Sequence, residues 1–233
     1  MKSIISIAIF LISILSFQAQ SNAEKANTIA SEIVEAMGGI ENYNNTHFIQ
    51  WDFGKRTLYW DKWTGDVRVE SPEKNLVVLV NINTLAGKVF ENGTLITDEE
   101  KTTNLLTRGK NWWINDSYWL VMPWKLQDPG VTLTYVKTET LTDGKLADVL
   151  QLTFDSVGVT PENKYLLYVD QETHLIKQWA FFKNFNDPKP KFTRPWDNYQ
   201  KLGDILLSFN RSEFGPTNVV VKQDVDAELF TDL

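Results

Sequence analysis

Short runs in which apolar and polar residues alternate with a period of two recur along the chain, and this pattern constrains the fold more than any other sequence feature. Such alternation is typical of strands with one buried face. The alternating runs lie at residues 49–53, 58–60, 67–69, 131–135, 150–154 and 165–169. The run 174–183 continues the predicted sheet, and the runs 205–209 and 219–225 can close it. A further run, Leu76 to Ile82, is apolar on both faces and predicts a central strand. Because the connections are too short for crossover helices, we expect about eight to eleven strands, mostly antiparallel.

Two segments interrupt the alternation with helical spacing. In the first, apolar residues from Asn22 to Met37 recur every three or four positions, and Gly38-Gly39 follows as a stop signal. The second begins at Thr97-Asp98-Glu99-Glu100, which has the form of a capping box with Thr97 as the N-cap residue. Both segments therefore predict helices.

The second helix is expected to extend to Met122, because Pro123 cannot continue it. Gly109 is a candidate break that would divide it in two. The two helices are the elements available to cover the sheet, so the predicted fold class is α+β. We expect a large curved antiparallel sheet, a half-barrel, covered by an N-terminal helix and a mid-chain helical insertion. Residues 21–233 would form a single domain, with a helical lid around 97–122.

Residues 1–20 have the three-part layout of a secretory signal peptide. Lys2 supplies the positive charge, and an apolar run from Ile4 to Phe17 follows it. This run is about 14 residues long, shorter than the roughly 20 that a membrane-spanning helix needs. The candidate cleavage sites follow Ala19, Gln20 and Ala23. We expect secretion across the inner membrane to the periplasm, without a stable membrane anchor.

The charge balance narrows the class of partner. The chain has 30 acidic and 23 basic residues, a net charge of −7, and no cysteine. An exported protein without disulfides must be stable from its core alone. An acidic surface repels phosphate polymers, so we expect no nucleic-acid partner. The best basic cluster, Lys183 to Arg194, is interpreted as a solvated loop.

The sequence contains no catalytic signature. There is no Gly-x-Ser-x-Gly motif and no cysteine nucleophile. Two histidines and four carboxylates on or beside strands are the candidates for acid–base work: His47, His174, Asp52, Asp61, Asp66 and Glu70. A pair of these carboxylates could act as in a glycosidase, but a solvated strand face gives the same pattern. We therefore predict no enzyme, no metal and no cofactor.

The segment from Asn111 to Lys125 concentrates aromatic surface, with four of the nine tryptophans. This surface must be buried against either the protein's own core or a ligand, and both alternatives remain open. In the second case the helical aromatics line or lid a cavity whose opposite wall is formed by strand residues. The candidate ligand-binding residues are Trp51, Trp60, Leu79, Trp113, Trp119, Met122 and Trp124.

Exposed tryptophans could instead stack on sugar rings. Trp63, in a turn-like Trp-Thr-Gly-Asp sequence, is the best candidate, and Trp196 is the second. A packed core with such surface tryptophans would favour a glycan-binding or protein-interaction module.

The order of elements resembles the periplasmic lipoprotein-carrier family of the LolA, LolB and RseB kind. The resemblance rests on the signal peptide, the helix ending in Met37-Gly38-Gly39, the strand meander, the central helix, and the hairpin from Asp170 to Lys177. It is strongest to LolA-like proteins that Bacteroidetes export. The resemblance implies an incomplete barrel lidded by helices and enclosing a cavity that receives acyl chains. The leading hypothesis is therefore an exported protein that binds a lipid, another hydrophobic small molecule or the acyl chains of envelope lipoproteins.

Overall fold

The computed structural model describes residues 20–233, so the predicted signal peptide lies outside the described residues except for Gln20. The chain divides into two compact units, each discontinuous in sequence. The first holds the described residues up to Ala36 together with Lys125–Thr193, and the second holds Met37–Trp124 and Arg194–Leu233. One domain over residues 21–233 stays a prediction. Within residues 20–233, no helix combines the length and apolarity that crossing a membrane requires.

The second unit is built on a seven-stranded antiparallel sheet with the order β14-β1-β2-β3-β4-β5-β6. The sheet does not close on itself, since β14 and β6 form its edges. Its strands are β1 (Phe48–Phe53), β2 (Arg56–Asp61), β3 (Asp66–Ser71), β4 (Leu76–Asn81), β5 (Gly87–Glu91), β6 (Thr94–Leu95) and β14 (Thr217–Lys222). The unit also holds the hairpin of β12 (Asp197–Leu202) and β13 (Ile205–Asn210), and the helices α2 (Ile40–Asn45), α3 (Glu99–Val121), η1 (Pro72–Lys74) and η3 (Ala227–Phe230). The short helix η2 (Met122–Lys125) follows α3.

Strand register divides the seven-stranded sheet into two faces, because directly opposite residues point to the same side. On one face, Trp60 lies opposite Val67, and Val67 lies opposite Val80. On the other face, residues of four neighbouring strands form one row. That row consists of Gln50, Tyr59, Arg68 and Leu79.

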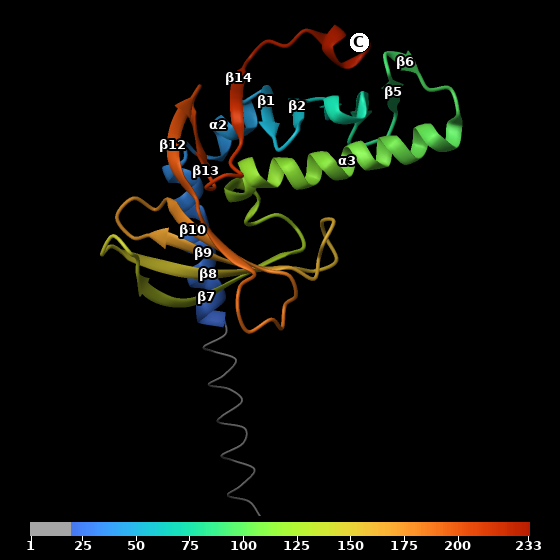
Figure 1. Ribbon diagram of the computed structural model, residues 1–233. Helices are drawn as coiled ribbons and strands as arrows, with labels where there is room; N and C mark the ends of the chain where they lie inside the picture. The colour runs from blue at the N-terminus through green and yellow to red at the C-terminus, as the bar shows by residue number, and fades with distance from the viewer. Residues whose placement is uncertain (1–19) are drawn as a thin grey trace, which may run out of the picture. The chain divides into compact units, whose positions relative to one another are not determined.

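The helix α3 covers the first of these faces (Figure 1). A Cβ atom placed on Gly109 would lie 2.5 Å from Val78 Cγ1, so the glycine allows the helix to approach β4 closely. The predicted break at Gly109 is wrong, because α3 is continuous from Glu99 to Val121. The predicted N-cap is wrong by one residue: the Asp98 side chain, and not Thr97, caps the helix by accepting a hydrogen bond from the Lys101 amide at 2.7 Å.

The first unit contains a five-stranded antiparallel sheet with the order β11-β10-β9-β8-β7. Its strands are β7 (Val131–Thr140), β8 (Leu146–Phe154), β9 (Lys164–Asp170), β10 (Ile176–Phe182) and β11 (Phe192–Pro195). The helix over residues 20–36 packs against this sheet. Its Lys25 ammonium lies 3.5 Å from an Asp148 oxygen and 3.5 Å from the centre of the Tyr135 ring. The β9–β10 turn is fixed by Asp170, whose carboxylate accepts hydrogen bonds from the amides of Glu172 and Thr173.

The α+β class, with helices covering antiparallel sheet, is confirmed. The described residues form fourteen strands in three sheets, more strands than the alternation predicted. The strands β5, β6, β11 and β12 lie outside the recognised runs. They are short or largely exposed, so they carry little hydrophobic alternation.

Replacing Gly109 with Ala tests the close contact between α3 and β4. Alanine ordinarily favours a helix over glycine by about 1 kcal/mol. Here the added methyl group meets Val78, so we expect the free energy of unfolding to fall by about 1–3 kcal/mol. Urea denaturation measures the change, with the exposed Asn111→Ala on the same helix as control. A more stable Gly109→Ala variant would contradict the contact.

Candidate functional site

Indole rings of the aromatic segment contact the seven-stranded sheet directly. The Trp113 ring meets Trp60 edge to face, with the ring centres 5.0 Å apart. Nearer the end of α3, the Trp119 ring lies 5.4 Å from that of Phe53. We call the five tryptophans on this side of the sheet the indole layer: Trp51, Trp60, Trp113, Trp119 and Trp124. In this structure the layer is the packing surface between α3 and the strands.

The end of the indole layer packs on the short helix α2. Trp124 stacks on Tyr43 with the ring centres 4.7 Å apart and the planes within 8°. The Lys62 ammonium lies 3.6 Å from the centre of the Tyr43 ring. Met122, two residues before Trp124 in the chain, is also buried and begins η2.

Five of the seven predicted ligand-binding residues belong to this layer, and a sixth, Met122, lies between Trp119 and Trp124 in the chain. The exception is Leu79, which lies in the row with Arg68 on the opposite face of the sheet. The structure therefore brings Trp51 and Trp60 to the side of Trp113 but does not bring Leu79 there. Leu79 is only 2% exposed, so it is buried on that second face.

Four indole nitrogens of the layer are buried without an acceptor. Among residues 20–233, no hydrogen-bond partner lies within reach of Nε1 of Trp51, Trp60, Trp113 or Trp124. Buried tryptophan N–H groups usually have a partner. Each unpaired buried donor costs about 1–3 kcal/mol, so the layer contains four N–H groups whose hydrogen-bonding capacity is unused.

A buried ion pair crosses the same interface. The Arg56 guanidinium donates from Nε to Asp116 Oδ2 at 2.7 Å and from a terminal nitrogen to Oδ1 at 2.9 Å. Asp116 is fully buried on α3, whereas Arg56 is partly exposed on β2. Sequence reasoning missed this pair, since the partners are 60 residues apart and only the carboxylate within an aromatic helical stretch hinted at it.

Arg211 is a fully buried cation that the sequence did not reveal. It is 0% exposed and lies 3.3 Å above the centre of the Trp196 ring. Its guanidinium donates to Ser208 Oγ at 2.7 Å and to the Trp119 carbonyl, near the end of α3, at 3.0 Å. Burial lowers the pKa of Arg211 to about 9, so the side chain remains a cation at neutral pH. Arg211 thereby links α3 to β13.

The two sugar-stacking candidates differ in exposure. Trp196 is 1% exposed beneath Arg211, so its interpretation as a surface stacking residue is wrong. Trp63 is 60% exposed. One face of its ring stacks on His47 at 3.9 Å, and its indole nitrogen donates to the Asn44 carbonyl at 3.2 Å. Trp63 is therefore held in place while remaining exposed.

Asp61 anchors the turn that carries Trp63. Burial raises the pKa of Asp61, but hydrogen bonds from the amides of Thr64 and Trp63 and from His47 outweigh it, so the pKa lies below its ordinary value of 3.8. The remaining strand carboxylates are also engaged. Asp52 accepts hydrogen bonds from Thr57 and Asn218, Asp66 from Asn81, and Glu70 from Arg68. Over residues 20–233, no cluster of three or more His, Asp or Glu side chains could hold a metal ion.

No protein-family model matches this chain, and no protein of curated function is similar to it. Several solved structures are similar. A DUF1329 family protein from Desulfovibrio piger has a TM-score of 0.46 and 11% identity, covering 90% of this chain and 97% of its own. A putative outer membrane lipoprotein-sorting protein domain from Vibrio parahaemolyticus has a TM-score of 0.46 and 10% identity, and the match covers 90% of this chain and 97% of that domain. A LolA superfamily protein from Nitrosomonas europaea has a TM-score of 0.45 and 13% identity, and the match covers 89% of this chain and 97% of that protein.

A LolA superfamily protein is thus among the solved structures to which this chain is similar. At 10 to 13% identity the likeness concerns the fold alone. What the site binds has to be inferred from the residues of this chain.

Removing the buried carboxylate tests whether the ion pair holds α3 on the sheet. Asp116→Ala removes two charge-assisted hydrogen bonds from Arg56, which is partly exposed, so we expect the free energy of unfolding to fall by about 1–3 kcal/mol. A double-mutant cycle with Arg56→Met measures the coupling by urea denaturation. Coupling below about 0.5 kcal/mol would contradict a structural role for the pair.

The lowered pKa of Asp61 predicts how stability depends on pH. The folded state favours the carboxylate, so its contribution is fully present above the unfolded-state pKa of about 3.9 and is lost as pH falls through the lower folded-state pKa. The difference in unfolding free energy between the native protein and Asp61→Asn should therefore shrink below about pH 4. Thermal denaturation over this range measures it. A difference that grows as pH falls has the wrong sign for this account.

Proposed function

We propose that the protein is an exported periplasmic protein that binds an apolar ligand, a lipid or the acyl chains of a lipoprotein, between α3 and the seven-stranded sheet. It performs no chemistry and needs no cofactor. The observation that carries the proposal is the set of four buried indole N–H groups without acceptors. An acyl ester supplies carbonyl oxygens as acceptors together with a chain that packs on indole rings.

The helix α3 has the role of a lid in this proposal. In the structure it lies directly on the strands, with Gly109 against Val78 and Trp113 against Trp60. Ligand entry therefore requires α3 to move away from the sheet. The Arg56–Asp116 pair opposes this separation, because it joins β2 to α3. In the ligand-free state the indole N–H donors have no acceptor, and in the ligand-bound state they would donate to the ligand's carbonyl oxygens.

Magnitudes favour exchangeable binding over permanent storage. Burying about ten methylenes at roughly 0.8 kcal/mol each gives a gross gain near 8 kcal/mol. Association costs at least about 4 kcal/mol of this, and separating α3 from the sheet costs more. Satisfying the indole donors returns part of the difference. The resulting weak affinity suits a carrier that must also release its ligand.

Matched lipids test the role of the indole donors. Trp60→Phe and Trp113→Phe keep an aromatic ring but remove the N–H group. We expect each to weaken binding of a lysophospholipid with an acyl ester by about five-fold, since one hydrogen bond is lost. Binding of the alkyl-ether analogue, which lacks the carbonyl, should change little. Titration calorimetry measures both affinities.

Trp63→Phe is the control for these variants, because Trp63 is exposed on a turn outside the indole layer. It should leave lysophospholipid binding unchanged. Equal binding of ester and ether lipids by the native protein, or no binding of either, would contradict the proposal.

Exposure of Trp63 supports a second candidate function, glycan binding. Its ring is exposed but immobilised by His47 and Asn44, as a stacking platform for a sugar ring requires. Trp63→Ala should then abolish retention on a polysaccharide affinity column while thermal stability stays nearly unchanged. Retention equal to that of the native protein would exclude this function.

A further inference from the structure

Cations from three separate segments surround Trp112 on one flank of α3. The Arg56 guanidinium, from β2, lies over the Trp112 ring at 5.3 Å from its centre, and the Lys74 ammonium, from η1, lies 5.2 Å from it. Arg108 precedes Trp112 by four residues, so both side chains lie on the same flank of the helix. We call Arg56, Lys74, Arg108 and Trp112 the cationic flank.

Two cations of this flank have no acidic partner. Lys74 and Arg108 are both exposed, and neither makes a hydrogen bond or an ion pair with another residue in the range 20–233. Lys101, nearer the start of α3, is by contrast paired with Glu91 at 2.7 Å. The charges of Lys74 and Arg108 are therefore available to a binding partner.

The carboxylates beside this flank are already engaged. Glu73 accepts a hydrogen bond from Lys55, and Asp116 is fully buried beneath the helix and bound to Arg56. With Lys55 included, four cations face two carboxylates, of which only Glu73 reaches solvent. A chain with a net charge of −7 thus presents a locally positive surface here.

Trp112 adds an amphipathic group to the same surface. Its side chain is half-buried, and its indole nitrogen is neither buried nor bonded to an acceptor among residues 20–233. The N–H group is therefore open to solvent, unlike the four buried ones of the indole layer. A tryptophan with a free N–H beside lysine and arginine is typical of protein surfaces at the head-group level of a membrane.

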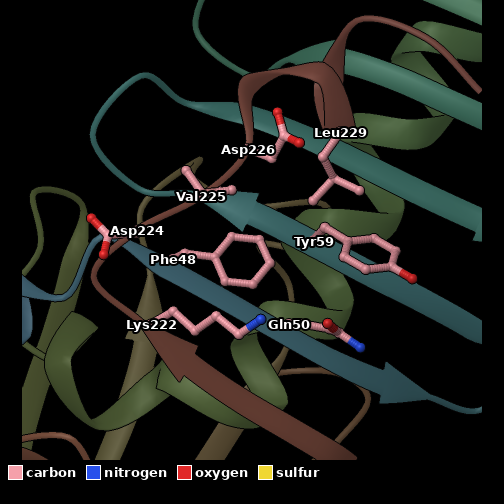
Figure 2. A pocket seen from close by; sticks show the side chains of 8 residues that line it. All are labelled: Phe48, Gln50, Tyr59, Lys222, Asp224, Val225, Asp226 and Leu229. Atoms are coloured by element: carbon pink, nitrogen blue, oxygen red, sulfur yellow. The ribbon is translucent and has the colours of Figure 1, made fainter.

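The opposite face of the sheet offers no comparable positive surface. A pocket of about 330 Å³ opens there, beside β1, β2 and β14 (Figure 2). Its lining holds one ammonium group, that of Lys222, and two carboxylates, those of Asp224 and Asp226. Its charge is therefore negative, and an anionic partner would favour the side of the sheet that α3 covers.

We propose that the cationic flank docks α3 on an anionic phospholipid surface. Lys74 and Arg108 donate to the phosphate oxygens of the head groups, and Trp112 lies at head-group level. The indole favours a lipid surface over an acidic protein segment, because a bilayer offers phosphate groups with an apolar layer beneath them. Docking brings the helix that we propose as a lid to a source of lipid, but it depends only on the charges of the flank.

Vesicles of two compositions test the docking. The mature chain is floated with vesicles of phosphatidylcholine alone, or of equal parts phosphatidylglycerol and phosphatidylcholine. Each cation near an anionic surface contributes about five-fold to affinity, and the acidic remainder of the chain opposes part of this. We expect at least about ten-fold tighter binding to the anionic vesicles, weakening as salt is added. Equal binding to both vesicles, or binding to neither, would overturn the proposal.

Charge removal on α3 and η1 gives the matched test. Lys74→Gln and Arg108→Gln should each weaken binding to anionic vesicles by about five-fold. The control is Lys110→Gln, which removes a second unpaired cation from the same helix. Lys110 is two residues from Arg108, about 200° around the helix, so its loss should change vesicle binding little. Native-like binding by the Lys74→Gln/Arg108→Gln double variant, or equal loss in Lys110→Gln, contradicts the assignment.

A soluble polyglutamate peptide separates a lipid surface from an acidic protein segment. Compared per negative charge, it should bind at least about ten-fold more weakly than the anionic vesicles, since it offers no apolar layer for the indole. Trp112→Ala should weaken vesicle binding and leave peptide binding unchanged. Peptide that binds as tightly as the vesicles would assign the flank to an acidic protein and overturn the lipid proposal.

Docking and the lipid site under α3 can fail independently. Trp60→Phe should not alter vesicle docking, and the Lys74→Gln/Arg108→Gln double variant should not alter binding of a monomeric zwitterionic lysophospholipid. Vesicle docking that is lost in Trp60→Phe and kept in the double variant would move the membrane contact to the indole layer, against this proposal.

Discussion

The direct packing of α3 on the seven-stranded sheet is the constraint on which the functional account depends. It brings Gly109 to a position where a Cβ atom would meet Val78, and it brings the Arg56 guanidinium to the buried Asp116 carboxylate. The same packing buries the indole layer and separates four N–H donors from water without giving them acceptors. The helix thus fits the sheet closely and leaves four indole donors without acceptors, and under the proposed function a ligand supplies those acceptors.

The two faces of this sheet have different chemistry because β-strand side chains alternate. On the face toward α3 the strands present tryptophans and branched aliphatic residues. On the other face the row from Gln50 to Leu79 mixes polar, cationic and apolar groups, and the C-terminal segment lies over part of it. The sheet therefore has an apolar face under α3 and a face of mixed polarity on the other side.

Much of the fold could be predicted from hydrophobic period alone. The runs at 49–53, 150–154 and 165–169 are strands, and both predicted helices exist, because one buried face leaves a clear signal in each. Short or exposed strands such as β6 leave none. The local sequence also does not predict which strands belong to the same sheet, because sheet membership depends on hydrogen bonding between strands far apart in the chain.

The site was harder to predict, for reasons specific to its residues. Leu79 was assigned to the cavity side, but the run from Leu76 to Ile82 is apolar on both faces, so its sequence does not indicate which residues face α3. Trp196 is buried beneath Arg211, which follows both β12 and β13 in the chain. The pairing of Arg56 with Asp116 joins residues 60 positions apart. In each case the decisive contact is tertiary.

Native mass spectrometry of protein purified gently from its host envelope tests the central claim most directly. The account predicts a population of protein carrying a bound lipid, which organic extraction removes, and which is reduced when Trp60 and Trp113 are both replaced with Phe. Protein that is entirely ligand-free, and whose tryptophan fluorescence does not respond to added lysophospholipid, would contradict it.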